Sequence, residues 1–206
     1  RYGERLPIGT MEVVDNFKPE ELRDYYQKWY HPENQAIIVI GDIDVDHTEK
    51  MIKELFGDIK AGPLAAHVQP TPVPDNKEAI YIFDKDKEMQ YSIMNISMKT
   101  EAMPREYKGT QMLYVQSYLA NIIAAMFNAR MSEMALNPEC PYVQLGMNYG
   151  TYNVSKPVEA TSVTAVAKEG KEKETYATII RELKRVKEYG FTGSEFARAK
   201  EEFLSQ

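Results

Sequence analysis

The pattern of apolar residues predicts a helix, a strand and a second helix within residues 18–57. Lys18–Tyr30 carries apolar side chains at spacings of three and four residues, which gives a helix one apolar face. Ala36–Ile40 is an uninterrupted apolar run, typical of a strand that is covered on both faces. Asp46 can cap the next helix and Gly57 can end it. We expect the apolar stripe of this helix to be buried: Met51, Ile52, Leu55 and Phe56.

Prolines interrupt this pattern. The segment Gly62–Pro74 is rich in proline, which cannot donate a ladder hydrogen bond and which biases the preceding residue towards an extended conformation. We therefore interpret residues 62–74 as a linker or as a crossover along the edge of a sheet.

Beyond the prolines, pairs of strands are separated by helices. Apolar and polar residues alternate most clearly in Gln90–Lys99, and a long helix is predicted from about residue 107 to residue 136. A capping box at Thr192–Glu195 begins a last helix. The other predicted elements are the strands Ala79–Asp84, Val143–Tyr152 and Glu159–Ala167, and the helix Lys171–Tyr189 ended by Gly190. This order predicts an α+β fold, with a mainly antiparallel sheet packed against helices on one face.

The composition and net charge of the chain argue against some classes of binding partner. The chain is 43% hydrophobic and 27% charged, as is usual for a globular protein, and its net charge is -6. Nucleic acids and anionic membranes attract basic surfaces, so we expect neither as the main partner. No apolar run approaches the roughly 20 residues of a membrane span. The single cysteine, Cys140, excludes an internal disulfide.

The histidines do not have the spacing of a zinc peptidase. The motifs HxxEH and HExxH place two histidines on one helical face, with a glutamate between them as the general base. The three histidines here, His31, His47 and His67, are far apart in the sequence. We expect a surface or structural role for each of them, and no metal site in this chain.

Alternate carboxylates at Asp42, Asp44 and Asp46 resemble the start of a calcium loop. An EF-hand loop also needs a glycine at its sixth position and a glutamate at its twelfth, and these positions hold His47 and Lys53. We therefore interpret the acidic residues as a polar turn followed by a helix cap.

No nucleophilic motif is present either. Cys140 has no histidine near it in sequence, so a structural thiol is the simpler interpretation. The tyrosines at 142, 149 and 152 are compatible with a peptide-binding face, although a half-buried sheet rich in tyrosine explains them more simply.

Several segments, taken in order, resemble a known family. The chain has RLPIG at Arg5–Gly9, then DYYQKWYHPEN at Asp24–Asn34, then IIVIGDID at Ile37–Asp44, and then LFGDI at Leu55–Ile59. This succession resembles the junction between the first and second domains of pitrilysin/insulinase (M16) zinc peptidases. The later Asn128-Ala-Arg130-Met131 is similar to an asparagine/serine-x-Arg-Leu stretch of the same family.

The resemblance implies an M16 peptidase-like (LuxS/metallohydrolase-like) α/β roll. Residues 1–35 would be a junction segment and helix from the preceding catalytic domain, and residues 36–206 a non-catalytic domain. We expect both ends of the chain to be truncated, because it begins with Arg1 and stops inside a predicted helix. The zinc motif of the family would then lie in a first domain that is missing here.

The resemblance also suggests one substrate-binding residue. Some members hold the peptide with an arginine and a tyrosine from a later domain, and Tyr142 is at the position of that tyrosine. The arginine is not matched, because Ala135 and Leu136 occupy its region. We therefore expect no catalytic residue in this chain, and Tyr142 as the one candidate for contact with a substrate.

These implications give one main hypothesis and two alternatives. The first is a non-catalytic domain of a bacterial zinc metalloendopeptidase, exported or periplasmic, that partners the catalytic domain and other M16 domains, helps to enclose peptide substrates and is inactive alone. The second is a metal-free scaffold subunit of the same fold, like the core proteins of respiratory complexes. The third is an unrelated ligand-binding α+β domain, which would require a pocket with converging polar groups.

Overall fold

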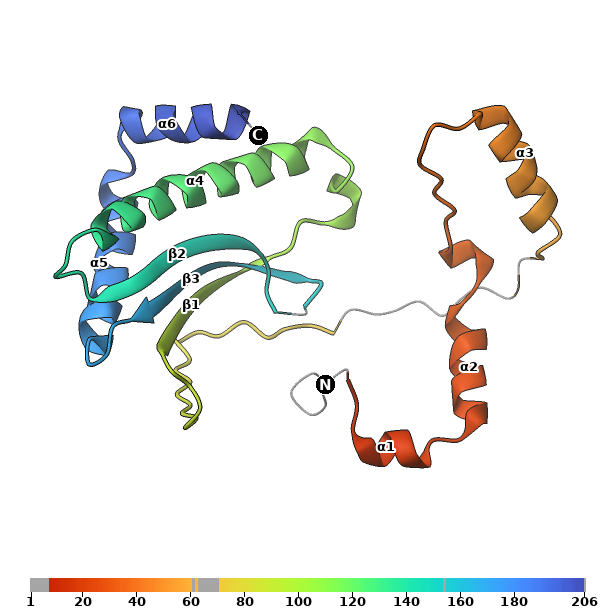
Figure 1. The fold of residues 1–206 in the computed structure, drawn as a ribbon, viewed down its shortest axis with the longest axis horizontal. Coiled ribbons are helices and arrows are strands. Elements are labelled where there is room, and N and C mark those ends of the chain that lie inside the picture. The colour runs from red at the N-terminus through yellow and green to blue at the C-terminus, as the bar shows by residue number, and fades with distance from the viewer. Residues whose placement is uncertain (1–7, 61, 63–70, 154, 206) are drawn as a thin grey trace. The chain divides into compact units, whose positions relative to one another are not determined.

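The computed structural model describes residues 8–60, 62, 71–153 and 155–205 (Figure 1). The chain divides into two compact units, Arg1–Gln69 and Pro70–Gln206. This division falls within the proline-rich segment 62–74, of which residues 63–70 lie outside the described residues. Residue 61 and the start of the RLPIG motif also lie outside them. The assignment of residues 1–35 to a preceding domain remains a prediction.

The first unit contains short helices. They are α1 (Met11–Asn16), α2 (Pro19–Trp29), the 3-10 turn Pro32–Asn34 and α3 (Val45–Phe56). The helix predicted over Lys18–Tyr30 is thus confirmed as α2. The cap predicted at Asp46 is wrong, because the Asp44 side chain accepts the bond from the main-chain N–H of His47, at 2.9 Å. Asp46 lies instead in the first turn, where a negative charge favours the helix.

Two further predictions for this unit are wrong. The segment 36–40 forms no strand, and Ile38 and Ile40 are 78% and 90% exposed. The apolar stripe of α3 is also uncovered, with Leu55 68% exposed. The physical reason is the same in both cases. A strand needs a hydrogen-bonded neighbour and an apolar stripe needs a surface to cover it, and the described part of this unit supplies neither.

The second unit is built on a three-stranded antiparallel sheet with the order β1-β3-β2. The strands are β1 (Ser92–Glu101), β2 (Tyr142–Thr151) and β3 (Val158–Ala167), which confirms the corresponding predictions. A register shift between Tyr142 and Gln144 marks a bulge at the start of β2. The strand predicted at Ala79–Asp84 is wrong, because these residues pair with no strand and Phe83 is 90% exposed.

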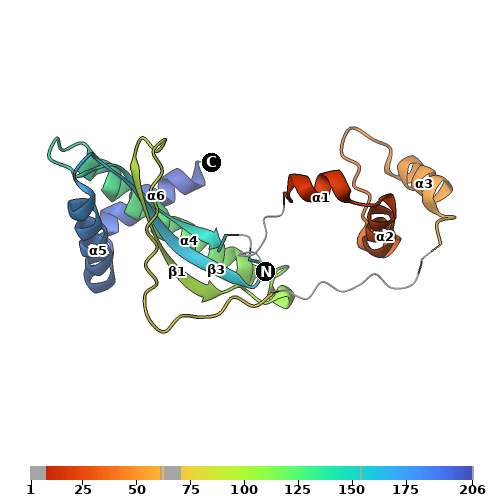
Figure 2. The same cartoon turned by 90° about the horizontal axis from the view of Figure 1, so that it is seen from below.

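Helices cover one face of this sheet. The long helix α4 (Gln111–Ala135) lies over the sheet, and α6 (Gly193–Leu204) packs on α4 (Figures 1 and 2). Helix α5 (Glu172–Tyr189) contacts β3. The sheet, α4 and α5 share the main core, formed by Phe127 and Met131 of α4, Cys140, Tyr142 and Leu145 in and before β2, Val163 and Ala165 of β3, and Ile179 of α5. A second cluster joins α6 to α4 through Ala199, Ile122 and Met126. The α+β fold predicted from the sequence is confirmed.

The connection between α5 and α6 follows the predicted signals. Gly190 ends α5 with a positive φ of 65°, a conformation that glycine adopts without steric cost. Thr192 and Glu195 form the predicted capping box at the start of α6. The sequence therefore fixes the point at which the chain turns back to place α6 on α4.

Candidate functional site

The positions of the His, Cys, Asp and Glu side chains test whether the described residues could bind a metal ion. The His31 ring lies 3.9 Å from the Glu33 carboxylate, and His47 lies in the first turn of α3. His67 lies outside the described residues. Within the part of the chain that the structure describes, no group of three His, Cys, Asp or Glu side chains converges as a metal site would require. These residues do not fit a zinc ion, which the resemblance places in another domain.

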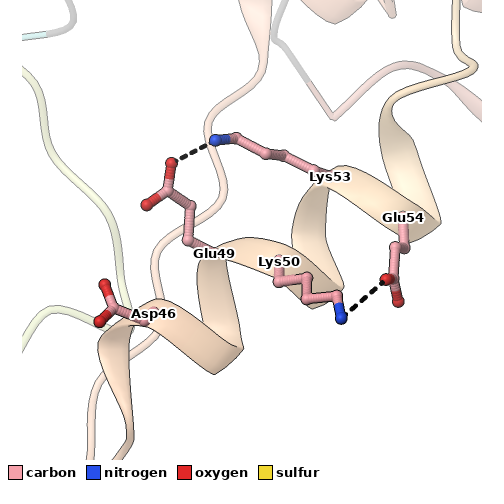
Figure 3. A pocket seen from close by; sticks show the side chains of 5 residues that line it. All are labelled: Asp46, Glu49, Lys50, Lys53 and Glu54. Atoms are coloured by element: carbon pink, nitrogen blue, oxygen red, sulfur yellow. Dashed lines mark ion pairs between the residues drawn. The ribbon is translucent and has the colours of Figure 1, made fainter.

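Of the acidic residues weighed as a calcium loop, only Asp46 lines a hollow, which is open and formed by side chains of α3. Figure 3 shows its lining, which consists of three carboxylates and two ammonium groups: Asp46, Glu49, Glu54, Lys50 and Lys53. Lys53 pairs with Glu49, and Lys50 lies 3.9 Å from Glu54. Because each lysine faces a carboxylate one turn away, the surface charge is largely balanced. All of these side chains are exposed, so the arrangement is that of a solvated helix face.

Tyr142 is a core residue in this structure. It is 1% exposed, and its hydroxyl donates a hydrogen bond of 2.7 Å to the main-chain oxygen of Met131. Burial raises the pKa of this phenol above its usual range. The hydroxyl ties β2 to the last turns of α4, and it would have to leave the core to contact a peptide. A substrate contact by Tyr142 therefore remains a prediction, and the geometry supports a structural role.

The other tyrosines are also engaged by the protein. The Tyr149 hydroxyl accepts a hydrogen bond of 2.8 Å from the Gln116 side chain and donates one to Glu159. Desolvation and the neighbouring carboxylate raise the pKa of Tyr149. Tyr152 is half-buried in the turn after β2. The hydroxyls of Tyr142 and Tyr149 thus bond within the fold, as expected for the simpler of the two interpretations of these residues.

The sequence did not predict the ion pair between Arg130 and Glu195. Arg130 Nε and Nη2 donate to the two carboxylate oxygens of Glu195, at 2.8 and 2.9 Å, and both side chains are 14% exposed. The guanidinium also lies 4.9 Å from the ring centre of Phe191 and donates to the Gly190 carbonyl at 3.4 Å. This contact holds the α5–α6 connection against α4. The Asn128–Met131 motif and the capping box were the available signals, but neither of these local motifs indicates that it contacts the other.

The Arg130–Glu195 pair has a clear electrostatic signature. The guanidinium holds the pKa of Glu195 down, to about 2, and the carboxylate raises the pKa of Arg130. Arg130 Nη1 is buried and has no hydrogen-bond partner among the described residues. A mostly buried bidentate pair of this kind fixes the relative position of the two elements that it joins. It is a structural clamp.

Comparison with known proteins gives the family. A family model described as the peptidase M16 inactive domain matches residues 16–203. The chain belongs to the peptidase M16 family. The match covers nearly the whole chain and spans both compact units. The resemblance inferred from the sequence is thereby confirmed, including its assignment to the non-catalytic domain.

Relatives in the family are longer proteins. The probable zinc protease PqqL of Escherichia coli is 23% identical over 193 residues, which are 93% of this chain and 20% of that protein. The crystal structure of the periplasmic protease PqqL from Escherichia coli matches 99% of this chain and 22% of its own, with a TM-score of 0.84 and 21% identity. The structure of the first half of that protease matches 99% of this chain and 42% of its own, with a TM-score of 0.79 and 20% identity. The chain spans about a fifth of the length of the whole relatives.

No helix among the described residues is both long and apolar enough to cross a membrane.

Proposed function

We propose that this chain is the non-catalytic domain of a zinc-dependent metalloendopeptidase. In this role it braces the catalytic domain, helps to enclose and position peptide substrates, and has no peptidase activity alone. The observation that carries the proposal is the match of residues 16–203 to the inactive M16 domain. The donor groups support it, since no three metal-ligating side chains converge in the described residues. Zinc would be held by another domain of the parent protein.

The exposed apolar surface of the first unit supports a docking role. None of the residues described between 8 and 60 is buried, although the region contains many large apolar side chains. So much exposed apolar surface is unusual in a free soluble protein and supports a surface that another protein or domain covers. The apolar segment 36–40 is suited to pair with a strand of the preceding catalytic domain.

Helix α4 supports the same role in the second unit. Residues 111–129 contain no charged side chain, and their exposed apolar residues include Met112, Val115, Leu119 and Ile123. A helix that faces water normally carries charged residues on its outer side. An uncharged outer face is instead suited to packing against another domain. The parent chamber would then have this domain as part of its wall, where it excludes water and folded proteins from the substrate.

The parent protein is proposed to be bacterial and exported. The matched structure of PqqL is described as a periplasmic protease. A net charge of -6 and a single buried cysteine are compatible with an oxidising compartment, because no pair of thiols is exposed to form unwanted disulfides.

The proposal is tested by reconstitution. The remainder of the parent protein is expressed without this chain and assayed on a quenched peptide, with and without the 206-residue chain added in trans. We expect zinc-dependent cleavage only when both are present, and none from this chain with zinc alone. Cleavage by the rigorously purified chain alone would refute its assignment as inactive, and a lack of rescue would refute the bracing role.

Variants locate the docking surface. Ile38→Lys places a charge on the exposed segment 36–40 and should abolish rescue in trans. Leu136→Lys is the matched control, because Leu136 is equally exposed but lies after α4 in the second unit. Zinc content of the intact parent separates the peptidase from the metal-free scaffold: one zinc per chain is expected here, and none would favour the scaffold.

A further inference from the structure

One side chain of α4 pairs with β2 as a neighbouring strand would. Asn128 Nδ2 donates to the main-chain oxygen of Met147 at 3.0 Å, and Asn128 Oδ1 accepts from the main-chain N–H of Met147 at 2.6 Å. A single carboxamide therefore satisfies both hydrogen-bonding groups of one residue. An adjacent strand offers the same pair of groups to a residue on its partner.

The main-chain N–H and carbonyl of Met147 point away from the neighbouring strand β3. In an antiparallel ladder, hydrogen-bonded and non-hydrogen-bonded pairs alternate. At the turn, the N–H of Tyr152 donates to the Val158 oxygen at 3.0 Å, which identifies a hydrogen-bonded pair. Met147 lies an odd number of residues before Tyr152, so Met147 and Val163 form a non-hydrogen-bonded pair. Its N–H and carbonyl therefore face the outer side of β2, which is an edge strand.

The surroundings hold Asn128 at this edge. Its neighbours Phe127 and Met131 are fully buried in the core, which fixes the helix and so fixes the side chain. Gly146 lies next to this side chain on the strand, since a Cβ there would be in ordinary van der Waals contact with Asn128 Oδ1, at 3.4 Å. A carboxamide that is already ordered by its helix loses little further entropy when it bonds to the strand.

We propose that Asn128 is an edge cap that closes β2 to strand addition. An open edge presents unpaired N–H and carbonyl groups to any extended chain, which can lead to self-association. On β2 the outward groups recur at every second residue, with Met147 between those of Leu145 and Tyr149. A strand that pairs along this edge must displace Asn128 and break both of its bonds. The cap thus prevents a peptide or a second copy of the chain from pairing at β2.

The experiment removes the cap in the 206-residue chain. In Asn128→Ala, hydrogen exchange at the Met147 amide should become at least about tenfold faster, as expected when one protecting hydrogen bond is lost. Light scattering after gel filtration should show concentration-dependent self-association. The matched control is Asn121→Ala, since Asn121 is an exposed asparagine of the same helix. It should leave exchange at Met147 and the oligomeric state unchanged.

Two further variants keep the test decisive. Asn128→Asp keeps the acceptor for the Met147 N–H but loses the donor to the Met147 carbonyl. Exchange at Met147 should therefore stay slow while self-association is intermediate, and this variant serves even if Asn128→Ala fails to fold. Asn128→Ala with Asn148→Lys adds a charge to the exposed face of β2 and should restore the monomer, because like charges would meet across a paired edge. A folded Asn128→Ala variant that stays monomeric with unchanged exchange at Met147 would overturn the proposal, as would a folded Asn128→Asp variant that stays monomeric. So would self-association that the added lysine does not reduce.

Discussion

The two units of this chain carry similar sequence patterns but differ in what they bury. Helices α3 and α5 are both amphipathic and both end at a glycine. Helix α5 buries Ile179 completely, whereas α3 buries no residue and leaves Leu55 68% exposed. The comparison teaches that periodicity specifies a helix and its apolar face, while burial depends on whether the same chain supplies a surface for that face.

The strands show the same contrast. The segment 36–40 is more apolar than β3, but it remains unpaired, whereas β3 pairs with a strand on each side. Strand formation requires hydrogen-bonding partners that lie elsewhere in the sequence, and β3 has two of them. A high β-propensity does not substitute for a partner.

The largest expected effect is the loss of unfolding free energy when an apolar side chain is truncated in the second unit rather than in the first. Phe127→Ala removes a fully buried ring at the centre of the second unit and should cost about 3–5 kcal/mol of unfolding free energy. Leu55→Ala in α3 should change it by less than about 0.5 kcal/mol, because Leu55 is exposed in this chain. Urea titration followed by circular dichroism measures both. Equal losses would mean that α3 also belongs to a cooperative core.

The Arg130–Glu195 clamp is the next largest test. Arg130→Met should cost about 3 kcal/mol, because it leaves a mostly buried carboxylate without its partner. Arg198→Met is the control, since Arg198 pairs with Glu133 on the surface, where both side chains are about two-thirds exposed. Chemical denaturation at pH 7 measures both, and similar losses for the two variants would argue against the clamp.

The same clamp predicts a pH dependence. The pKa of Glu195 is lowered from 4.5 to about 2 in the folded chain, so its ionised form stabilises the fold above pH 4.5. This contribution should be lost as the pH falls from 4.5 to 2, because the unfolded chain then takes up the proton first. Arg130→Met should flatten this part of the curve of unfolding free energy against pH. An unchanged slope would show that other carboxylates dominate acid unfolding.

Helix caps give a smaller test of the same contrast. Thr192→Ala removes the side-chain cap of α6, which packs on α4, and should cost about 1 kcal/mol. Asp44→Ala removes the corresponding cap of α3. It should reduce helix content slightly without moving the main unfolding transition, since α3 buries no residue. A shift of that transition by Asp44→Ala would contradict the separation of the two units.

The smallest expected effect is that of removing the first unit altogether. A chain of residues 70–206 contains all of the core of the second unit, so its thermal unfolding should superimpose on that of the whole chain. Calorimetry measures this, with the Phe127→Ala variant of the same length as the control for sensitivity. A clearly lower melting temperature would show that the first unit stabilises the second.

Much of the fold could be predicted from local signals. The long helix α4, the strands of the sheet and the capping box at Thr192 were predicted, because their periodicity and turn chemistry are local properties. Two errors, the strands at 36–40 and 79–84, share a cause: both segments have strand-like composition and no partner strand in the structure. The cap of α3 was misplaced because Asp44 and Asp46 both suit a helix start, and only the bond to His47 distinguishes them.

The candidate site was predicted less completely. Tyr142 was singled out for its position, but the sequence could not show that the bulge at the start of β2 and the end of α4 enclose it. Nor could it pair Arg130 with Glu195, which lie on different helices. The sequence by itself determined the family, the order of elements and the lack of a paired-histidine zinc motif, because these depend on residues close together in the chain. Only the tertiary structure decided which apolar faces are covered, that Tyr142 belongs to the core and that Asn128 meets the edge of β2, because burial and edge pairing depend on contacts between distant segments.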